Sequence, residues 1–301
     1  MNIGIAGLGL IGGSMAKAIK KYTWHQVYGF DTNEAVMRQA LADGNIDGVL
    51  DAETLSDCDI LLPALYPGAA VSYIKDSIPF MKKGLIIVDL CGVKKAVMYP
   101  VEALELPAGV LYFGGHPMAG LEKSGYAYSK ADLFRNASMI IVPVRKGDAK
   151  EENSGLTGQG ENPGQTAQEE ALKLIEGFFL SLGFSGITLT SAEEHDRVIA
   201  FTSQLAHVVS SAYVKSPTAL KHYGFSAGSY KDLTRVARLN EEMWTELFLD
   251  NADSLTEEID CIIRHLVEYR DAISERRRPE LKELLKEGRE RKEHIDTFEN
   301  S

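Results

Sequence analysis

The chain has 301 residues, 45% of them hydrophobic, and its 32 basic and 43 acidic residues give a net charge of −11 at pH 7. This composition is typical of a globular protein and excludes a disordered or collagen-like chain. Nucleic acid and anionic membrane are poor partners, because both would repel so acidic a surface. At roughly 150 residues per domain, the length suggests two domains.

The first half alternates short apolar strands with helical patterns, which predicts an α/β domain with a doubly wound parallel sheet. The predicted strands cover residues 2–6, 26–30, 59–63, 85–90, 110–114, 138–144 and 186–189. The predicted helices cover 11–20, 33–43, 67–78, 94–104 and 169–182. The polar segment 146–168 interrupts this series and is predicted to be an exposed loop insert.

From residue 191 onward strand patterns nearly vanish, which predicts an α/β domain over 1–190 and an all-helical domain over 191–301. Ser191 and Glu194 form a capping-box pattern that opens a helix to about residue 213. Apolar residues at spacings of mostly three, four and seven predict one long helix over 241–274, and a charged helix follows Pro279. Helices this long and apolar usually pair with another chain, so we predict a two-fold homodimer through this half.

The three cysteines, Cys58, Cys91 and Cys261, are far apart and form no CxxC pair. We therefore expect neither a disulfide framework nor a metal site, and a reducing cytoplasm fits this cysteine usage. The N-terminus lacks the basic start of a signal peptide, and no run of about 18 apolar residues occurs, so no membrane-spanning segment is expected.

Gly7, Gly9 and Gly12 form a G-x-G-x-x-G pattern between the first predicted strand and the first predicted helix. In this context the glycines permit a tight turn, the approach of a pyrophosphate to the backbone, and close packing of helix on strand. The N–H groups at the start of the helix, at Leu10 and Ile11, would face the phosphates. The pattern therefore predicts a dinucleotide-binding domain of the Rossmann type, against the alternative that these glycines only make a turn.

Asp31 ends the second predicted strand, 19 residues after Gly12. A carboxylate at this place accepts hydrogen bonds from the adenosine ribose and repels a 2′-phosphate, which favours NAD over NADP. The alternative is that Asp31 only caps the next helix.

His116 follows a predicted strand and a double glycine, so we expect it at the carboxyl edge of the sheet, where open α/β folds bind ligands. An imidazole there is suited to take a proton from a hydroxyl at neutral pH. The alternative is a histidine satisfied by backbone groups near Pro117. Lys94, at the start of a helix after a strand, could face the nicotinamide of the cofactor or form a salt bridge.

The helical half offers two further groups of candidates. Gln204 and His207 belong to a polar stripe whose short, uncharged side chains favour a lined pocket over a solvated face. Lys231 and Arg235 are four residues apart and would share one face of a helix. Two cations together could hold a dicarboxylate in an acidic chain, although a surface basic pair is the alternative; arginine suits a carboxylate better, because it binds bidentately.

Several motifs occur in order along the chain: GLGLIGGS (7–14), DLCGVK (89–94), GGHPMAGLEKSG (114–125), SQLAH (203–207), and YKDLTRVA with EMW (230–237 and 242–244). Together they resemble the prephenate/arogenate dehydrogenases of tyrosine biosynthesis, from residue 1 to about 275. The resemblance implies an NAD(P)-dependent oxidative decarboxylation, and Asp31 favours NAD as the cofactor. A ring carbinol of prephenate loses hydride, the ring carboxylate leaves as CO2, and the ring becomes aromatic.

The resemblance also implies roles for single residues. His116 matches the histidine that bonds to the ring hydroxyl and promotes hydride loss, and Arg235 matches the arginine that grips a substrate carboxylate. Glu122 matches a glutamate of the polar network around the pocket, and His207 matches a histidine near the substrate. Lys231 is a secondary candidate for substrate binding.

The chain departs from the family pattern at two places. Gly92 stands where the family has a serine that bonds to the catalytic histidine, and water or Ser124 could replace that hydroxyl. Gln204 stands in place of the first histidine of S-H-L-P-H, which leaves open the choice between prephenate, with a keto group, and arogenate, with an ammonium group.

Two alternatives of other classes remain. A β-hydroxyacid dehydrogenase would carry a catalytic lysine on the first long helix of the second domain, and the polar stripe has none. A dinucleotide-binding sensor without catalysis is compatible with the loss of the serine at Gly92.

Overall fold

The structure is a computed structural model that describes residues 1–144 and 163–299. Its two compact units are Met1–Asn251 and Ala252–Ser301. Most of the predicted loop at 146–168 lies outside the described residues. Residues 163–168, however, belong to helix α6 (Pro163–Ser181), so the loop prediction is wrong for them. The helix begins at a proline, which is favoured in the first turn because its missing N–H has no partner there anyway.

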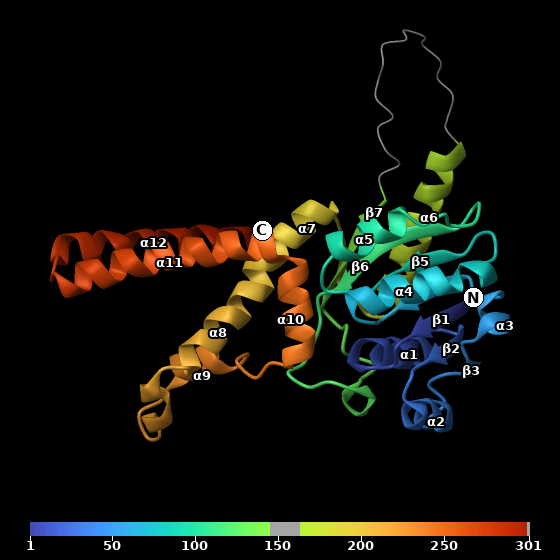
Figure 1. Ribbon diagram of the computed structural model, residues 1–301, viewed down its shortest axis with the longest axis horizontal. Coiled ribbons are helices and arrows are strands. Elements are labelled where there is room, and N and C mark those ends of the chain that lie inside the picture. Colours follow the sequence, from blue (N-terminus) through green and yellow to red (C-terminus); the bar gives the residue numbers. More distant parts are fainter. Residues whose placement is uncertain (145–162, 300–301) are drawn as a thin grey trace, which may run out of the picture. The chain divides into compact units, whose positions relative to one another are not determined.

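The first unit is built on an eight-stranded sheet in the order β3-β2-β1-β4-β5-β6-β7-β8 (Figure 1). The strands are β1 (Asn2–Ala6), β2 (Gln26–Phe30), β3 (Gly48–Val49), β4 (Ile60–Pro63), β5 (Ile86–Val88), β6 (Leu111–Pro117), β7 (Ser138–Pro143) and β8 (Gly186–Leu189). Every neighbouring pair is parallel except β6 and β7. This confirms the doubly wound, mostly parallel sheet, in which β7 and β8 run opposite to the other six strands.

Helices cover both faces of this sheet. One face carries α1 (Leu10–Tyr22), α2 (Glu34–Ala42) and α6, and the other carries α3 (Ala52–Leu55), α4 (Pro67–Ser77) and α5 (Lys95–Glu102). Successive strand residues point to opposite faces, so Ile60 and Leu62 join one core while Leu61 joins the other. Strands buried on both sides explain the near-continuous apolar runs of the sequence.

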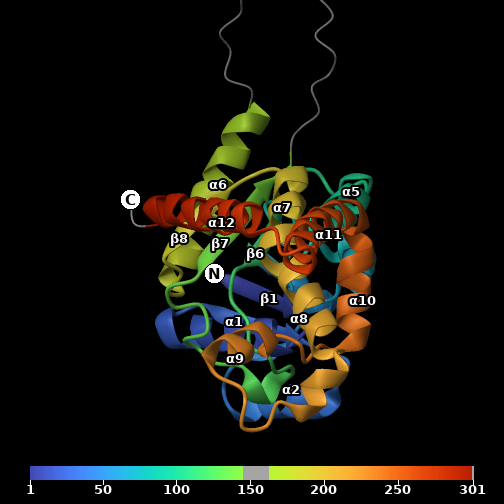
Figure 2. The ribbon, with the colours of Figure 1, turned by 90° about the vertical axis from the view of Figure 1, so that its left-hand side faces the viewer.

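The helical part of this unit begins at the predicted cap, where the Ser191 side chain accepts the N–H of Glu194. The predicted helix to residue 213 is present as α7 (Ala192–Ile199), a π-helical segment (Ala200–Leu205) and α8 (Ala206–Val214). The short helix α9 (Gly228–Thr234) follows, and then α10 (Glu241–Asp250). Figure 2 shows α8 and α10 side by side.

The prediction of a single helix over 241–274 is wrong, because the chain forms two helices that are separated at Asn251. The backbone there leaves the helical region (φ −122°, ψ 29°), and the side chain turns inward with only 1% of the residue exposed. Its Nδ2 donates to the backbone oxygen of Asp196 and to Oε1 of Gln204, both at 2.8 Å. These tertiary hydrogen bonds compensate for the interrupted helix.

The second unit is a hairpin of α11 (Ala252–Ser274) and α12 (Arg278–Glu299). Arg276 adopts the left-handed conformation between them (φ +54°), and the Tyr269 hydroxyl donates to the Leu284 backbone oxygen at 3.1 Å. Apolar side chains such as Leu266 and Leu285 stay exposed on this hairpin. Among the residues that the structure describes, no helix has the length and apolarity needed to cross a membrane.

Candidate active site

The glycine turn between β1 and α1 has the shape that a dinucleotide requires. Gly7 is left-handed (φ +89°), and a Cβ at Gly12 would lie 1.9 Å from the Gly7 oxygen, so both positions exclude a side chain. A Cβ at Gly9, in contrast, would meet no atom within 4 Å. The residue preceding α1 thus borders open space, and no side chain caps the helix. The N–H groups at Leu10 and Ile11 are available to an anion such as a pyrophosphate.

Asp31 directly follows β2 and joins this turn. Its Oδ2 accepts the N–H of Leu8 and its Oδ1 accepts the N–H of Asn33, both at 2.8 Å. The side-chain cap of α2 is Asn33, so Asp31 is not the capping residue of that helix. Each carboxylate oxygen keeps a lone pair, which leaves Asp31 able to accept a ribose hydroxyl beside the glycine turn.

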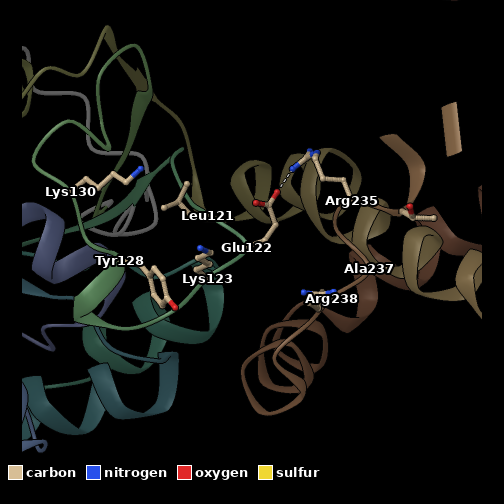
Figure 3. A pocket seen from close by; sticks show the side chains of 9 residues that line it. Leu121, Glu122, Lys123, Tyr128, Lys130, Arg235, Ala237 and Arg238 are labelled. Carbon is tan, nitrogen blue, oxygen red and sulfur yellow. Dashed lines mark hydrogen bonds and ion pairs between the residues drawn. The ribbon is translucent and has the colours of Figure 1, made fainter. Parts of the chain in front are cut away.

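A cavity of about 660 Å³ lies between the loop that follows β6 and the segment that follows α9 (Figure 3). Glu122 and Arg235 point toward each other there and form an ion pair. The backbone N–H of Glu122 and this arginine lower the pKa of the Glu122 carboxyl. Three more basic side chains line the cavity: Lys123, Lys130 and Arg238. A cavity of this size with an excess of cations suits a small anionic ligand.

His207 lies near this ion pair, and the charges of Arg235 and Glu122 both act on it. Its Nδ1 donates to the Ser203 backbone oxygen at 2.9 Å, which leaves Nε2 free for another partner. Its ring packs against Trp244 of α10 with 3.9 Å between the ring centroids. Burial lowers the pKa of His207, which favours the neutral ring.

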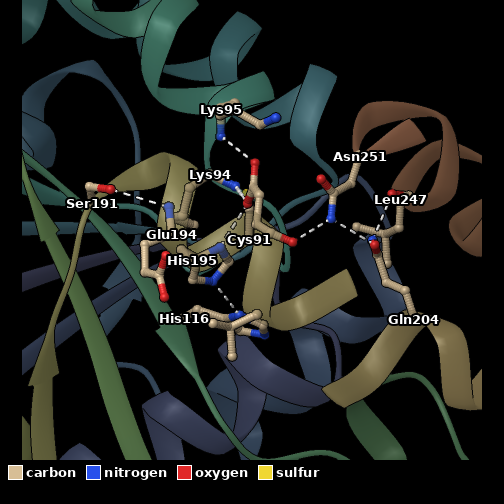
Figure 4. Close-up of polar contacts among 12 residues, drawn as sticks. Cys91, Lys94, Lys95, His116, Ser191, Glu194, His195, Gln204, Leu247 and Asn251 are labelled. Carbon is tan, nitrogen blue, oxygen red and sulfur yellow. Dashed lines mark hydrogen bonds and ion pairs between the residues drawn. The ribbon is translucent and has the colours of Figure 1, made fainter. Parts of the chain in front are cut away.

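His116 lies in the last part of β6, at the carboxyl edge of the sheet. The same edge carries the glycine turn, because β1, β4, β5 and β6 run parallel. The Nδ1 of His116 lies 2.9 Å from Nε2 of His195, and Nδ1 of His195 lies 2.7 Å from Oδ1 of Asp196 (Figure 4). Burial, followed by His195 and Lys94, lowers the pKa of His116 well below its usual range.

The other ring nitrogen of His116 faces Gly92. A Cβ at Gly92 would lie 4.0 Å from Nε2 of His116 and 3.5 Å from Leu247. Leu247 is three residues after Trp244, so one face of α10 reaches Gly92 through Leu247 and His207 through Trp244. Ser124, the residue suggested to replace the missing serine, lies on an exposed loop.

For Lys94 the structure contains the salt bridge and not a side chain that faces a cofactor. The side chain is fully buried, its Nζ pairs with Asp89, and the same nitrogen donates to the Gly115 backbone oxygen at 2.6 Å. Asp89 also accepts the Cys91 N–H at 3.0 Å and the Tyr112 hydroxyl at 2.7 Å. Lys94 therefore braces the end of β5 against β6.

Two predicted substrate ligands lie elsewhere. Gln204 is 2% exposed, donates to the Leu247 backbone oxygen and accepts from Asn251, so its amide fastens the π-helical segment to the end of α10. Lys231 lies on α9, but that helix ends at Thr234 and Arg235 is its C-cap. Arg235 lines the cavity and Lys231 is not among the lining residues.

His195 and Asp196 are functional candidates that the sequence reasoning missed. Both are buried on α7, together with Ala192 and Ile199. These positions follow the i, i+3, i+4, i+7 spacing of a buried helix face, so two polar residues on an apolar stripe were the available signal. The π-helical segment that follows is a second mark, because such turns occur frequently at functional sites.

Comparison with known proteins agrees with this geometry. Residues 15–154 match the family model of the prephenate dehydrogenase nucleotide-binding domain, and residues 191–287 match that of the prephenate dehydrogenase dimerization domain. A cyclohexadienyl dehydrogenase of Zymomonas mobilis is 32% identical over 301 residues, which cover 95% of this chain and 93% of the relative. A prephenate dehydrogenase of Lactococcus lactis is 29% identical over 297 residues, covering 95% of this chain and 75% of the relative.

A solved structure has the same fold over nearly the whole length. The crystal structure of prephenate dehydrogenase from A. aeolicus in complex with hydroxyphenyl propionate and NAD+ has a TM-score of 0.80 and 26% identity, and the match covers 98% of each chain. The chain belongs to the prephenate dehydrogenase family.

Proposed function

We propose that this protein is an NAD-dependent prephenate dehydrogenase, which converts prephenate to 4-hydroxyphenylpyruvate in tyrosine biosynthesis. When bound, NAD supplies the hydride acceptor. The observation that carries the proposal is the histidine at the carboxyl end of β6, on the same sheet edge as an open dinucleotide turn. A hydride donor, a base and a cofactor must meet at one place for this chemistry, and open α/β sheets bind ligands along that edge.

The proposed cofactor site consists of Gly7, Gly9, Gly12 and Asp31, with the N–H groups of Leu10 and Ile11. The space beside Gly9 gives room for a pyrophosphate, and the Asp31 carboxylate favours an unphosphorylated ribose. Lys94 has a different part in this proposal: it keeps the neighbouring strand ends in place.

The proposed base is His116, which accepts the hydroxyl proton of the ring carbinol as the hydride leaves. Its lowered pKa keeps the ring unprotonated at neutral pH, the form in which it can accept a proton. Nδ1 is held by His195, so Nε2 is the atom left for the substrate. Aromatisation of the ring drives the loss of CO2, so the chain's own part is alignment and proton handling.

The proposed substrate site is the cationic cavity with His207. Prephenate carries two carboxylates, and the basic side chains of the cavity attract a dianion toward an otherwise acidic protein. Arg235 is the proposed carboxylate ligand, because its planar guanidinium binds a carboxylate through two hydrogen bonds. It then exchanges its partner, from Glu122 to the substrate.

We further propose that the chain works as a homodimer in the cytoplasm, with a functional boundary near residue 190. The dimerization-domain match over 191–287 and the exposed apolar side chains of the α11–α12 hairpin support the dimer. The free state of Cys58, Cys91 and Cys261 suits a reducing compartment.

The test is turnover measured by the absorbance of reduced cofactor, with prephenate or arogenate and with NAD or NADP. Turnover of prephenate with NAD is the expected result. Turnover of arogenate but not of prephenate would support the second candidate, an arogenate dehydrogenase. The Glu122 carboxylate in the cavity favours this candidate, because it could pair with the ammonium group of arogenate. Binding of NAD without any turnover would indicate a dinucleotide sensor and refute the proposal.

The matched variant for this test is Arg235→Gln. We expect a higher Michaelis constant for prephenate and an unchanged affinity for NAD, since Arg235 lines the cavity and lies outside the glycine turn. An unchanged Michaelis constant would remove Arg235 from the substrate site.

A further inference from the structure

Three side chains form a line of hydrogen bonds that ends at the proposed base. Asp196 and His195 are neighbours on α7, and His116 belongs to β6, 79 residues away from His195 in the chain. His195 is 2% exposed and Asp196 is fully buried. Figure 4 shows the imidazoles of His116 and His195 pointing toward each other.

The carboxylate at the end of this line accepts hydrogen bonds at both of its oxygens. Oδ1 of Asp196 accepts the backbone N–H of Lys94 at 2.7 Å, and Oδ2 accepts the backbone N–H of Lys95 at 2.9 Å. Both N–H groups lie at the start of α5, where the helix dipole favours a negative charge. The third contact of Asp196, with Nδ1 of His195, must then be one in which the imidazole donates.

The tautomers follow step by step from that donor. A neutral imidazole has one N–H and one lone pair, so His195 with a proton on Nδ1 offers a lone pair at Nε2. That lone pair must receive a hydrogen from Nδ1 of His116. His116 then carries its lone pair on Nε2, the nitrogen that faces Gly92. Burial lowers the pKa of both rings, which supports their neutral forms.

We propose that His195 and Asp196 are positioning residues that hold His116 in the tautomer with an unprotonated Nε2. This inference rests on the proposed function and deepens it, because only that tautomer can accept the proton of the substrate hydroxyl. His195 and Asp196 act through His116 and need not touch the substrate. In this chain Nδ1 of His116 has a fixed partner, while position 92 supplies no hydroxyl.

The line also gives the accepted proton a place to stay. As the C–H electron pair leaves the carbinol carbon as hydride, the O–H proton moves to Nε2 of His116 and the Nδ1 proton can shift to Nε2 of His195. The C–C bond to the ring carboxylate breaks, CO2 leaves, and the electron pair of that bond completes the aromatic ring. The proton then returns to the phenolic oxygen, so the reaction needs no proton exchange with solvent. This agrees with the burial of His195 and Asp196.

The charged groups around the line are arranged for such a transient cation. Asp196 raises the pKa of His195 through its hydrogen bond and charge, while burial and the Lys94 ammonium lower it. Asp89 neutralises that ammonium through their buried ion pair. The net result is a base that is neutral at rest, with a carboxylate in place to stabilise the proton once it arrives.

The direct test is the nitrogen-15 spectrum of the histidine rings in the full-length protein without substrate, at pH 7.5. We expect His116 to show a protonated Nδ1 and an unprotonated Nε2, and His195 to show the same pattern; the His116→Asn and His195→Gln spectra assign the resonances. A protonated Nε2 in His116 would overturn the proposal. Because no substrate is present, this outcome is independent of whether prephenate is the substrate.

The kinetic test compares two variants of one residue. His195→Leu removes the acceptor for Nδ1 of His116, and we expect kcat to fall by about 10²–10³-fold with a Michaelis constant for prephenate within about threefold of the wild type, as for loss of a group that serves a general base. His195→Gln keeps an acceptor oxygen and should recover roughly tenfold of that loss, the worth of one hydrogen bond.

The control is His25→Leu, at a histidine just before β2 whose ring contacts the N-terminal amine. We expect it to keep the wild-type kcat. Equal rates for His195→Leu, His195→Gln and the wild type would refute a positioning role. An equal loss of kcat in His195→Leu and His195→Gln, with unchanged ring tautomers in His195→Gln, would also refute the positioning role. A purely structural defect predicts this result, because an acceptor at position 195 would then give no rescue.

Discussion

Gly9 and Gly12 of the dinucleotide turn should respond differently to replacement by alanine: one variant should lose NAD affinity and the other should lose stability. A methyl group at Gly12 would lie 1.9 Å from the Gly7 oxygen and 3.0 Å from the Ala64 Cβ, so β1 and α1 would have to move apart. Overpacking of this kind costs about 1–3 kcal/mol. At about 2–4 °C per kcal/mol for a unit of this size, Gly12→Ala should lower Tm by roughly 2–12 °C.

Gly9→Ala places its methyl group in open space, and its backbone (φ −70°) is accessible to alanine. We expect the free energy of unfolding to change by no more than about 0.5 kcal/mol. If a pyrophosphate occupies that space, the methyl group displaces it from the helix N–H groups. The loss of one charge-assisted hydrogen bond, about 1.5–3 kcal/mol, weakens NAD binding roughly 10–150-fold.

Thermal unfolding without cofactor and calorimetric titration with NAD separate the two effects. The expected result is a Gly9→Ala protein with the Tm of the wild type and a weak affinity for NAD, beside a Gly12→Ala protein with a lowered Tm. NAD binding of wild-type strength in Gly9→Ala would show that the dinucleotide does not approach this turn, and the assignment of the cofactor site would fail.

Three other perturbations test the site. His116→Asn should lower kcat about 10²–10⁴-fold with unchanged NAD affinity. In the wild type, the acid limb of kcat/KM should lie below pH 6.5, because the base works unprotonated and burial lowers the pKa of His116. An acid limb above pH 6.5 would contradict this. Gly92→Ser should fold normally, since its Cβ meets only ordinary contacts, and thermal unfolding checks this. Lys94→Met leaves the buried Asp89 carboxylate without its cationic partner and should lower the free energy of unfolding, measured with urea, by about 3–5 kcal/mol. Lys95→Met should lower the free energy of unfolding far less.

The sheet could be predicted well because its signals are local. Asn2–Ala6, Gln26–Phe30 and Gly186–Leu189 are strands with the predicted bounds, since apolar runs bounded by turn residues carry their own limits. The glycine turn was visible for the same reason. The break at Asn251 was not, because apolar spacing continues across it from Trp244 to Leu255, and the hydrogen bonds that hold Asn251 come from α7 and the π-helical segment.

In the candidate site, too, local features could be predicted from the sequence and tertiary contacts could not. His116 was predicted from its place after a strand, which the chain specifies locally. Its partner His195 lies 79 residues away in the chain and reaches it through tertiary packing, in which α7 lies against α5. Lys94 and Gln204 have side chains that form suitable ligands, but burial gave them partners within the protein. Residue type indicates what a side chain can bind, whereas tertiary packing decides which partner is within reach.

The π-helical segment Ala200–Leu205 lies between the two histidines of this helical stretch, His195 before it and His207 after it. A π turn accommodates one residue more than an α turn. Deletion of a single residue from this segment, such as Thr202, would restore regular winding and leave the residues downstream in nearly the same direction, because the π turn already absorbs the extra residue. His207 would then keep its contact with Trp244, and His195 would keep its contact with His116. One codon can thus be lost or gained at this segment while the groups on either side of it stay in place, whereas the same change in a regular α-helix would rotate everything downstream by about 100°.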